Sequence, residues 1–511
     1  MSSTPTSSDA AAAKADDKLD RGLLMIASVV VLGAIMSILD VTVVNVAINT
    51  LAKDFNTTLT TIQWVATGYT LALATVIPLT GWAADRFGTK RLYMTSIALF
   101  VCGSMLSGLA WSSGSLIAFR ILQGFGGGML MPAGMTILTQ AAGPQRVGRV
   151  MAVIGVPMLL GPIFGPILGG WLVDSFSWRW IFFINVPIGA LALIMSLRIL
   201  PKDVPNAAQR LDWTGLLLLS PSLALIIYGL AKSGSSGGFG HAAVVIPVVA
   251  GALVLATFVW HALRTSNALI DLRLFKNKTF SASMITLALM IVAVFGGMLL
   301  VPLYLQAVRG ETAFDTGLLL APQGFGAMIS MPIAGRLTDR TGTGRIVPVG
   351  LVLVGLSFLG LTQLQGDTSY WALGAILFVQ GLGMGAAMMP TFSGAMQTLR
   401  RAAIARASTT LNINQQVFAS VGTAIMSVLL ANALTSRLGA GAGIGGAGGG
   451  GPRTTALMAD AYASTFWIAL ALVVVAFVVA LILLPKRKPE PIEDPDAPGA
   501  EPAEAAALAM A

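Results

Sequence analysis

Long apolar stretches recur along almost the whole chain, and they restrict its possible folds more than any other feature. Each is long enough to cross a bilayer as an α-helix, which takes about 20 apolar residues. Only 10% of the 511 residues are charged, against about 25% in a soluble chain, so a soluble multidomain enzyme is excluded. The sequence predicts an all-α polytopic membrane protein with 14 transmembrane helices, near residues 23–48, 62–82, 92–110, 116–138, 150–173, 180–200, 214–230, 243–263, 281–305, 316–337, 346–365, 370–392, 408–433 and 466–484.

The basic residues indicate how these helices are oriented. If the N-terminus is cytoplasmic, 24 of the 31 Lys and Arg fall on the cytoplasmic side and six on the other side, as the positive-inside rule requires. We therefore expect both termini in the cytoplasm, within polar, disordered tails at 1–20 and 485–511. The net charge of +9 reflects this orientation, so no nucleic acid is expected as a partner.

Composition also argues against catalysis. The chain has two His and one Cys, too few for a metal centre or a disulfide framework. It shows no nucleophile–base constellation either. We expect no enzyme activity, no metal and no cofactor.

One loop sequence occurs twice. The segment from Gly81 to Arg91 returns 254 residues later with six of eleven positions identical, and Gln-Gly-x-Gly at 123–126 returns at 380–383. Eight predicted helices lie between the copies where six would make one repeat, which predicts a 6+2+6 arrangement: six helices in 21–200, a two-helix insertion in 201–278 and six helices in 279–484. The loops are either ordinary solvated turns or a cytoplasmic latch that holds one conformation, formed by Gly81, Asp85, Arg86, Gly88, Arg91, Asp339 and Arg340.

Two charges are embedded in the predicted helices. Asp40 is the one acid of 22 that lies deep in an apolar run, and Arg120 is the one embedded base. Embedded acids are costly and mark proton relays or ion pathways, so we expect Asp40 and Arg120 to couple transport to protons. The alternatives are a neutral Asp in a static hydrogen bond and an Arg that extends to the membrane surface. The equivalent positions of the second repeat lack these charges.

The predicted fifth helix carries Gly every four residues. This spacing places Gly161, Gly165 and Gly169 on one face, where a neighbouring helix can approach closely. Two prolines would each remove a backbone hydrogen bond and bend the helix. The motif comprises Gly161, Pro162, Gly165, Pro166, Gly169 and Gly170, and a plain packing seam explains it equally well.

A binding pocket is expected near the bilayer midplane, between the two halves. Polar and aromatic side chains of the helices are candidates for its lining, although Trp64 is equally typical of a membrane-interface aromatic. The candidates are Asn45, Trp64, Tyr69, Gln123, Tyr304, Asn412 and Gln415.

These motifs resemble those of the major facilitator superfamily, in particular its fourteen-helix drug:proton antiporters of the EmrB/QacA type. The match rests on the acidic motif at 39–47, the loop at 81–91, Arg120 to Gly124, Gly165 to Gly170, and residues 178–189. Two departures stand out: Thr89 replaces a usually basic residue, and predicted helices nine to fourteen carry no acid.

The resemblance implies a monomeric antiporter in the cell membrane. It would export small amphipathic or cationic compounds, including antibiotics, by alternating access, driven by the proton gradient. Two alternatives remain open. One is a proton-coupled nutrient importer, against which the Gly165–Gly170 motif argues. The other is a receptor or assembly factor that transports nothing, against which the embedded charges argue.

Overall fold

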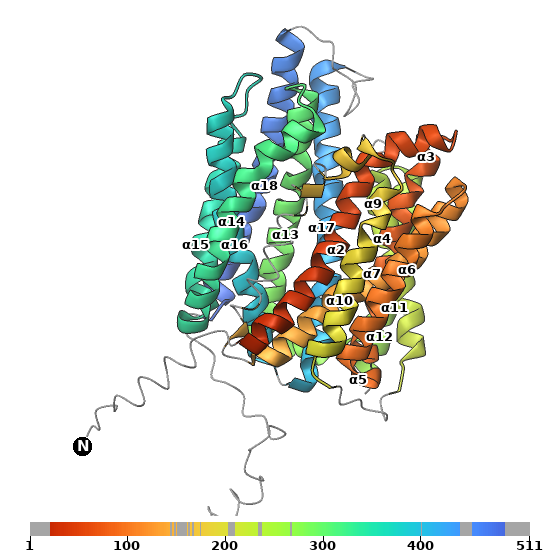
Figure 1. Ribbon diagram of the computed structural model, residues 1–511. Coiled ribbons are helices and arrows are strands. Elements are labelled where there is room, and N and C mark those ends of the chain that lie inside the picture. Colours follow the sequence, from red (N-terminus) through yellow and green to blue (C-terminus); the bar gives the residue numbers. More distant parts are fainter. Residues whose placement is uncertain are drawn as a thin grey trace, which may run out of the picture.

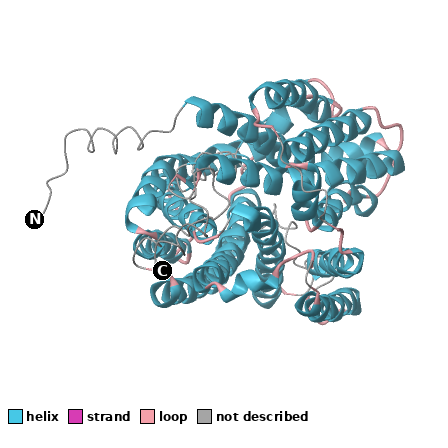
Figure 2. Cartoon of the chain, turned by 90° about the horizontal axis from the view of Figure 1, so that it is seen from below, coloured by secondary structure: helices cyan, strands magenta, loops and turns pink. Residues whose placement is uncertain are grey.

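A computed structural model describes residues 21–143, 146–147, 150, 161, 164–165, 168–173, 175–202, 210–233, 238–265, 268–399, 401–439 and 452–485. Over these residues the structure is helical and contains no strand (Figure 2). Its elements are α2 (Arg21–Asp54), α3 (Leu59–Ile62), α4 (Trp64–Val76), α5 (Leu79–Phe87), α6 (Thr89–Gly108), α7 (Ser113–Ala142), α9 (Trp180–Phe183), α10 (Asn185–Ile199), α11 (Trp213–Ser233), α12 (Ala242–Arg264), η1 (Leu272–Lys276), α13 (Lys278–Ala307), α14 (Ala313–Thr341), α15 (Thr343–Leu361), α16 (Tyr370–Gln397), α17 (Arg401–Leu438) and α18 (Pro452–Leu483).

The predicted helix count is confirmed. Eleven of the described helices are long and apolar enough to cross a membrane, and the bent pair α4–α5 makes up to a twelfth. The two other predicted spans, 92–110 and 150–173, overlap α6 and a stretch in which residues 161, 164–165 and 168–173 are helical. The described residues thus form an all-α structure that agrees with fourteen spans.

Several helices extend beyond the apolar runs that predicted them. For example, α17 has 38 residues where the sequence predicted 408–433. At 1.5 Å per residue it is about 57 Å long, well beyond the ~30 Å hydrocarbon core. The apolar limits therefore mark the bilayer, and polar residues continue the helix on both sides of it.

Local sequence sets many of the helix boundaries. The Ser112 side chain accepts a hydrogen bond from the backbone N–H of Ser115 in a capping box that starts α7. In the same way, Asn277 accepts from the backbone N–H groups of Thr279 and Phe280 to start α13. Pro78, which lacks an N–H, stands where α4 meets α5 at an angle of 55°.

The repeated loops adopt the same backbone turn. Gly88 ends α5 and precedes α6 at φ 92° and ψ 151°, and Gly342 joins α14 to α15 at φ 86° and ψ 163°. A positive φ of this kind is favourable only for glycine. The internal repeat in the sequence is therefore also a repeat in the structure.

The helices form two groups with a helix pair beside them (Figure 1). Helices α2, α4, α6, α7 and α10 pack on one another, as do α13 to α18. Between these groups in sequence, α11 and α12 pack together, and α11 also contacts α4 and α17. The two groups meet where the first third of α17 packs against α5 and α7. This is the end that bears the Gly88 turn, which the sequence predicts to be cytoplasmic.

Candidate functional site

The two embedded charges form a buried ion pair. Arg120 Nη1 on α7 lies 2.6 Å from Asp40 Oδ2 on α2, and the side chains are 1% and 0% exposed. Three helices contribute hydrogen bonds around it: Gln123 Nε2 donates to Asp40 Oδ1 (2.9 Å), Asn185 Nδ2 donates to the same oxygen (3.3 Å), and Arg120 Nη1 donates to Gln123 Oε1 (2.8 Å). Arg120 therefore does not extend to the membrane surface, and both carboxyl oxygens of Asp40 accept hydrogen bonds.

Aromatic rings and a backbone carbonyl enclose the guanidinium group. Arg120 Nε donates to the Val65 carbonyl oxygen (3.3 Å). Its Cζ lies 4.0 Å from the centre of the Tyr69 ring and 5.6 Å from that of Phe182. A cation over an aromatic face is stabilised most when water is absent, as here. Removing either partner of such a pair leaves an unpaired charge and typically costs about 3–5 kcal/mol.

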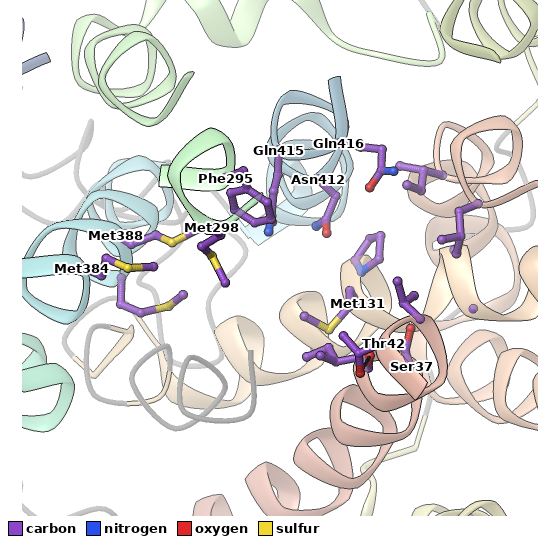
Figure 3. Close-up of a pocket in the computed structure, with 18 of the residues that line it drawn as sticks. Ser37, Thr42, Met131, Phe295, Met298, Met384, Met388, Asn412, Gln415 and Gln416 are labelled. Atoms are coloured by element: carbon purple, nitrogen blue, oxygen red, sulfur yellow. Dashed lines mark hydrogen bonds between the residues drawn. The ribbon is translucent and has the colours of Figure 1, made fainter. Parts of the chain in front are cut away.

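Beside this cluster lies a cavity of about 280 Å³ between the two groups of helices (Figure 3). Six methionines and Phe295 contribute to its largely apolar wall, and Asn412, Gln415 and Gln416 of α17 supply amide groups. No charged side chain is among its described lining residues. The lining consists of Ser37, Ile38, Val41, Thr42, Leu73, Ile77, Gly127, Gly128, Met131, Pro132, Phe295, Met298, Met331, Met384, Met388, Met389, Asn412, Gln415 and Gln416.

The ion pair and the cavity share their walls. Ser37 and Val41 of α2 face the cavity, while Asp40 between them lies behind it. Tyr69 lies between the two sites: its ring covers Arg120, and its hydroxyl oxygen would be 2.6 Å from a Cβ added at Gly127 in the cavity wall. A change at the ion pair can therefore reach the cavity through α2, α7 and Tyr69 without a water path.

The second half has a neutral counterpart of this cluster. Leu377 and Gln380 occupy the positions of Arg120 and Gln123, 257 residues later. There Gln323, the counterpart of Tyr69, donates from Nε2 to Gln380 Oε1 (3.0 Å) and to the sulfur of Met384 in the cavity wall (3.4 Å). Two amides thus replace a salt bridge.

The glycine face formed by Gly161, Gly165 and Gly169 packs directly on α2. A Cβ added at Gly161 would be 2.0 Å from Ile38 Cγ2, and one added at Gly165 would be 1.9 Å from Thr42 Oγ1. Thr42 Oγ1 in turn donates to the Gly161 carbonyl oxygen (3.3 Å). A Cβ at Gly169 would be 3.0 Å from Val43, whereas no described residue lies within 4 Å of one at Gly170. Pro162 and Pro166 lie outside the described residues.

The repeated loop joins the halves. Asp85 on α5 forms an ion pair with Arg406 near the start of α17 (3.6 Å), and a Cβ at Gly81 would be 3.1 Å from Thr409 Oγ1. Among the described residues no carboxylate lies within ion-pair distance of Arg86. Arg91 lies in the first turn of α6.

The second copy of the loop makes a different contact. Asp339 is buried and accepts a hydrogen bond from Gln397 Nε2 at the end of α16 (3.1 Å), and the neighbouring Arg340 is exposed. This contact stays within one half, whereas Asp85–Arg406 bridges the two.

The remaining pocket candidates lie in different places. Asn412 and Gln415 line the cavity, whereas Tyr69 and Gln123 belong to the ion-pair cluster behind it. Trp64 does not line the cavity: its ring, 38% exposed, stacks on Tyr228 of α11. Tyr304 is not in the cavity either. It lies near the C-terminal end of α13, where its hydroxyl donates to the carbonyl oxygen of Gln365. The side chain of Asn45 lies outside the described residues.

Sequence reasoning missed several participants. Asn185 and Ser104 hydrogen-bond to each other (3.0 Å) and support Asp40, and Phe182 faces Arg120. The run from residue 178 to 189 was singled out as a motif, but no role was given to Asn185 in it. No spacing in the sequence brings the methionines of the wall together, because they come from four helices, α7, α13, α14 and α16.

Comparison with known proteins agrees with this architecture. A family model described as Major Facilitator Superfamily matches residues 30–423. The chain is 45% identical over 496 residues to the "Multidrug resistance protein B homolog" of Mycobacterium tuberculosis (strain ATCC 25618 / H37Rv), covering 92% of each chain. It is 31% identical over 403 residues to the "Multidrug export protein EmrB" of Escherichia coli (strain K12), covering 78% of this chain and 79% of that one.

Solved structures show the same fold at low sequence identity. The proton:xylose symporter XylE superposes with a TM-score of 0.61 at 13% identity, over 92% of this chain and 98% of that one. The human organic anion transporter MFSD10 superposes with a TM-score of 0.58 at 15% identity, over 88% and 99%.

Proposed function

Because this chain belongs to the major facilitator superfamily, we propose that it exports small amphipathic compounds across the cell membrane in exchange for protons. It is a multi-pass membrane transporter of small molecules, and its relatives are transporters rather than enzymes. Relatives named for multidrug resistance and multidrug export support efflux as the direction of transport. The proton gradient would drive the monomer without a cofactor.

One observation carries the proposal: a fully buried carboxylate–guanidinium pair lies directly behind an apolar cavity. A proton that binds Asp40 cancels its negative charge and weakens its attraction for Arg120. The pair holds α2 against α7, and both helices line the cavity. Protonation would therefore alter the packing of the cavity wall, which is how proton uptake and substrate release become linked.

The contacts between the halves support an outward-facing state. Helix α17 meets α5 and α7 close to Arg406, at the predicted cytoplasmic end, and Asp85 bridges the halves there. In this state Asp40 would take up a proton from outside after substrate has left. Release of that proton to the cytoplasm would follow separation of the Asp85–Arg406 contact.

The proposal is tested in inverted membrane vesicles that contain the full chain. A proton gradient with the vesicle lumen acidic should drive accumulation of a lipophilic dye as protons leave, and a protonophore should abolish it. Dye movement in the opposite direction would favour a proton-coupled importer. Dye accumulation that does not depend on the gradient and equals that of vesicles without the chain would favour a receptor or assembly factor.

The cavity predicts a preference for neutral and singly charged compounds. Its described lining carries no charge, Asp40 is already paired, and Phe295 is its one described aromatic ring. Cation–π contact is worth about 2 kcal/mol when desolvated, less than a second buried charge needs. In a pump-deficient host, the chain should protect growth against the mono-quaternary member of a matched pair of amines and not against the bis-quaternary member. Stronger protection against the bis-quaternary compound would contradict this assignment of the cavity.

The distribution of basic residues predicts that both termini are cytoplasmic. Reporter domains fused after Lys18 and after Lys488 should both give a cytoplasmic signal. A reporter after Arg309, in the predicted outer loop between α13 and α14, is the control and should report the opposite side. An external C-terminus would require an odd number of spans.

A further inference from the structure

A second cavity, of about 290 Å³, lies where the helix pair joins the second half. Its wall is formed by the end of α12, the connection through η1, and the start of α17. The lining consists of Ala262, Leu263, Thr265, Ala268, Asp271, Leu272, Arg273, Lys276 and Arg406. Because Arg406 also contacts Asp85, this cavity lies at the end of the molecule that the sequence predicts to be cytoplasmic.

Positive charge dominates this cavity. Arg273, Lys276 and Arg406 line the cavity with one acid, Asp271, whose Oδ1 is already engaged as acceptor for the backbone N–H of Arg273 (3.0 Å). Asp85, outside the lining, pairs with Arg406 (3.6 Å) and leaves Arg273 and Lys276 as the excess positive charge. The nearby carboxylate of Asp212 lies outside the lining and is held by His261 Nε2 (2.9 Å) and the backbone N–H of Leu269 (3.2 Å). Three cations around one concave surface suit an anion with several oxygens, such as a phosphate group.

The rim of the cavity is apolar and exposed, which favours a lipid over a soluble anion. Leu263 is 70% exposed and Trp260, one turn earlier, is 57% exposed. Phe275 beside Lys276 is exposed as well. Arg264 lies over the Trp260 ring, its Cζ 4.2 Å from the ring centre, the arrangement of an aromatic anchor at a membrane surface. A headgroup could bind the cations while its acyl chains lie along α12.

We propose that this cavity binds the phosphate group of an anionic phospholipid from the cytoplasmic leaflet. Basic pockets between helices on this side of a membrane attract such headgroups, with each Lys or Arg adding to the attraction. Arg406 belongs both to this site and to the Asp85 contact, so a bound lipid lies against the junction of the two halves. The site does not depend on the transported substrate.

The test measures lipid retained by the full-length chain. Purified protein is reconstituted with equal amounts of phosphatidylglycerol and phosphatidylcholine, extracted, and examined by native mass spectrometry. We expect phosphatidylglycerol to be retained preferentially. The double variant Arg273→Gln/Lys276→Gln should lower the ratio of retained phosphatidylglycerol to phosphatidylcholine about tenfold. The control, Lys278→Gln/Arg198→Gln, removes the same charge from exposed positions that do not line the cavity and should retain the preference.

The outcomes separate the possible ligands. Equal loss in both double variants would overturn the site, because the preference would then follow overall charge. Inorganic phosphate, added at increasing concentration, should leave the retained phosphatidylglycerol unchanged. Displacement of the lipid by phosphate would overturn the assignment to a phospholipid and indicate a soluble phosphate ligand. Both double variants should give wild-type amounts of folded protein, which size-exclusion chromatography checks.

Discussion

Asp40→Asn is expected to abolish proton-driven efflux and return a pump-deficient host to the drug sensitivity it has without the transporter. Asn has the size of Asp and can still accept the hydrogen bonds of Gln123 and Asn185, but it cannot exchange a proton. It also leaves the guanidinium of Arg120 buried without a counter-charge. Growth inhibition and dye accumulation in inverted vesicles measure the effect.

Two controls separate coupling from folding. Asp54→Asn removes a carboxylate that is 56% exposed and pairs with Arg179 at 4.0 Å, and exposed pairs of this kind contribute about 0–1 kcal/mol. The amide oxygen of Asn can still accept the hydrogen bond of Trp178 Nε1 (2.6 Å), so efflux should persist. If Asp40→Asn lowers the amount of protein, Asp40→Asn/Arg120→Gln should restore it by removing the unpaired charge, yet remain inactive. Normal pumping by Asp40→Asn at every external pH would show that Asp40 is not the proton site.

Gly165→Leu is expected to eliminate transport, whereas Gly170→Leu on the same predicted helix should resemble the wild type. The side chain at 165 would have to occupy the space of Thr42 Oγ1, which a Cβ alone approaches to 1.9 Å, so the helix must move away from α2. Overpacking of this kind costs about 1–3 kcal/mol and would also break the Thr42 to Gly161 hydrogen bond. In the described part of the chain, nothing lies within 4 Å of a Cβ at Gly170.

The measurement compares protein amount and dye efflux for the two variants. Gly165→Ala adds one methyl group and should give an intermediate loss. Equal efflux by Gly165→Leu and Gly170→Leu would mean that close contact between this helix and α2 is dispensable for transport.

The sequence predicted the helices and singled out the two embedded charges for a shared physical reason, whereas their pairing became visible only in the structure. Lipid tolerates few polar groups, so apolar runs mark the spans, and a charge such as Asp40 or Arg120 within them stands out. The repeated loop was visible because the Gly88 and Gly342 turns need glycine in the same conformation.

Side-chain direction could not be predicted in the same way. Trp64 and Tyr304 have the right chemistry for a pocket, but helix packing turns one onto Tyr228 and the other toward Gln365. Asn185 supports Asp40 from 145 residues away, a distance in sequence that no local pattern spans. The cavity wall is assembled from seven helices, α2, α4, α7, α13, α14, α16 and α17, so its residues share no spacing in the sequence.

The neutral amide pair Gln323–Gln380 would determine how the exchange responds to the membrane potential. With the second half neutral at this position, Asp40 is the single buried carboxylate of the two equivalent clusters, and one cycle would carry one proton inward. Export of a monovalent cation would then be electroneutral and follow the pH difference alone. Export of a neutral compound would move one net positive charge inward, and a membrane potential would add about 2.3 kcal/mol per 100 mV to its driving force. The same protein would therefore be electrogenic or electrically silent according to the charge of its cargo.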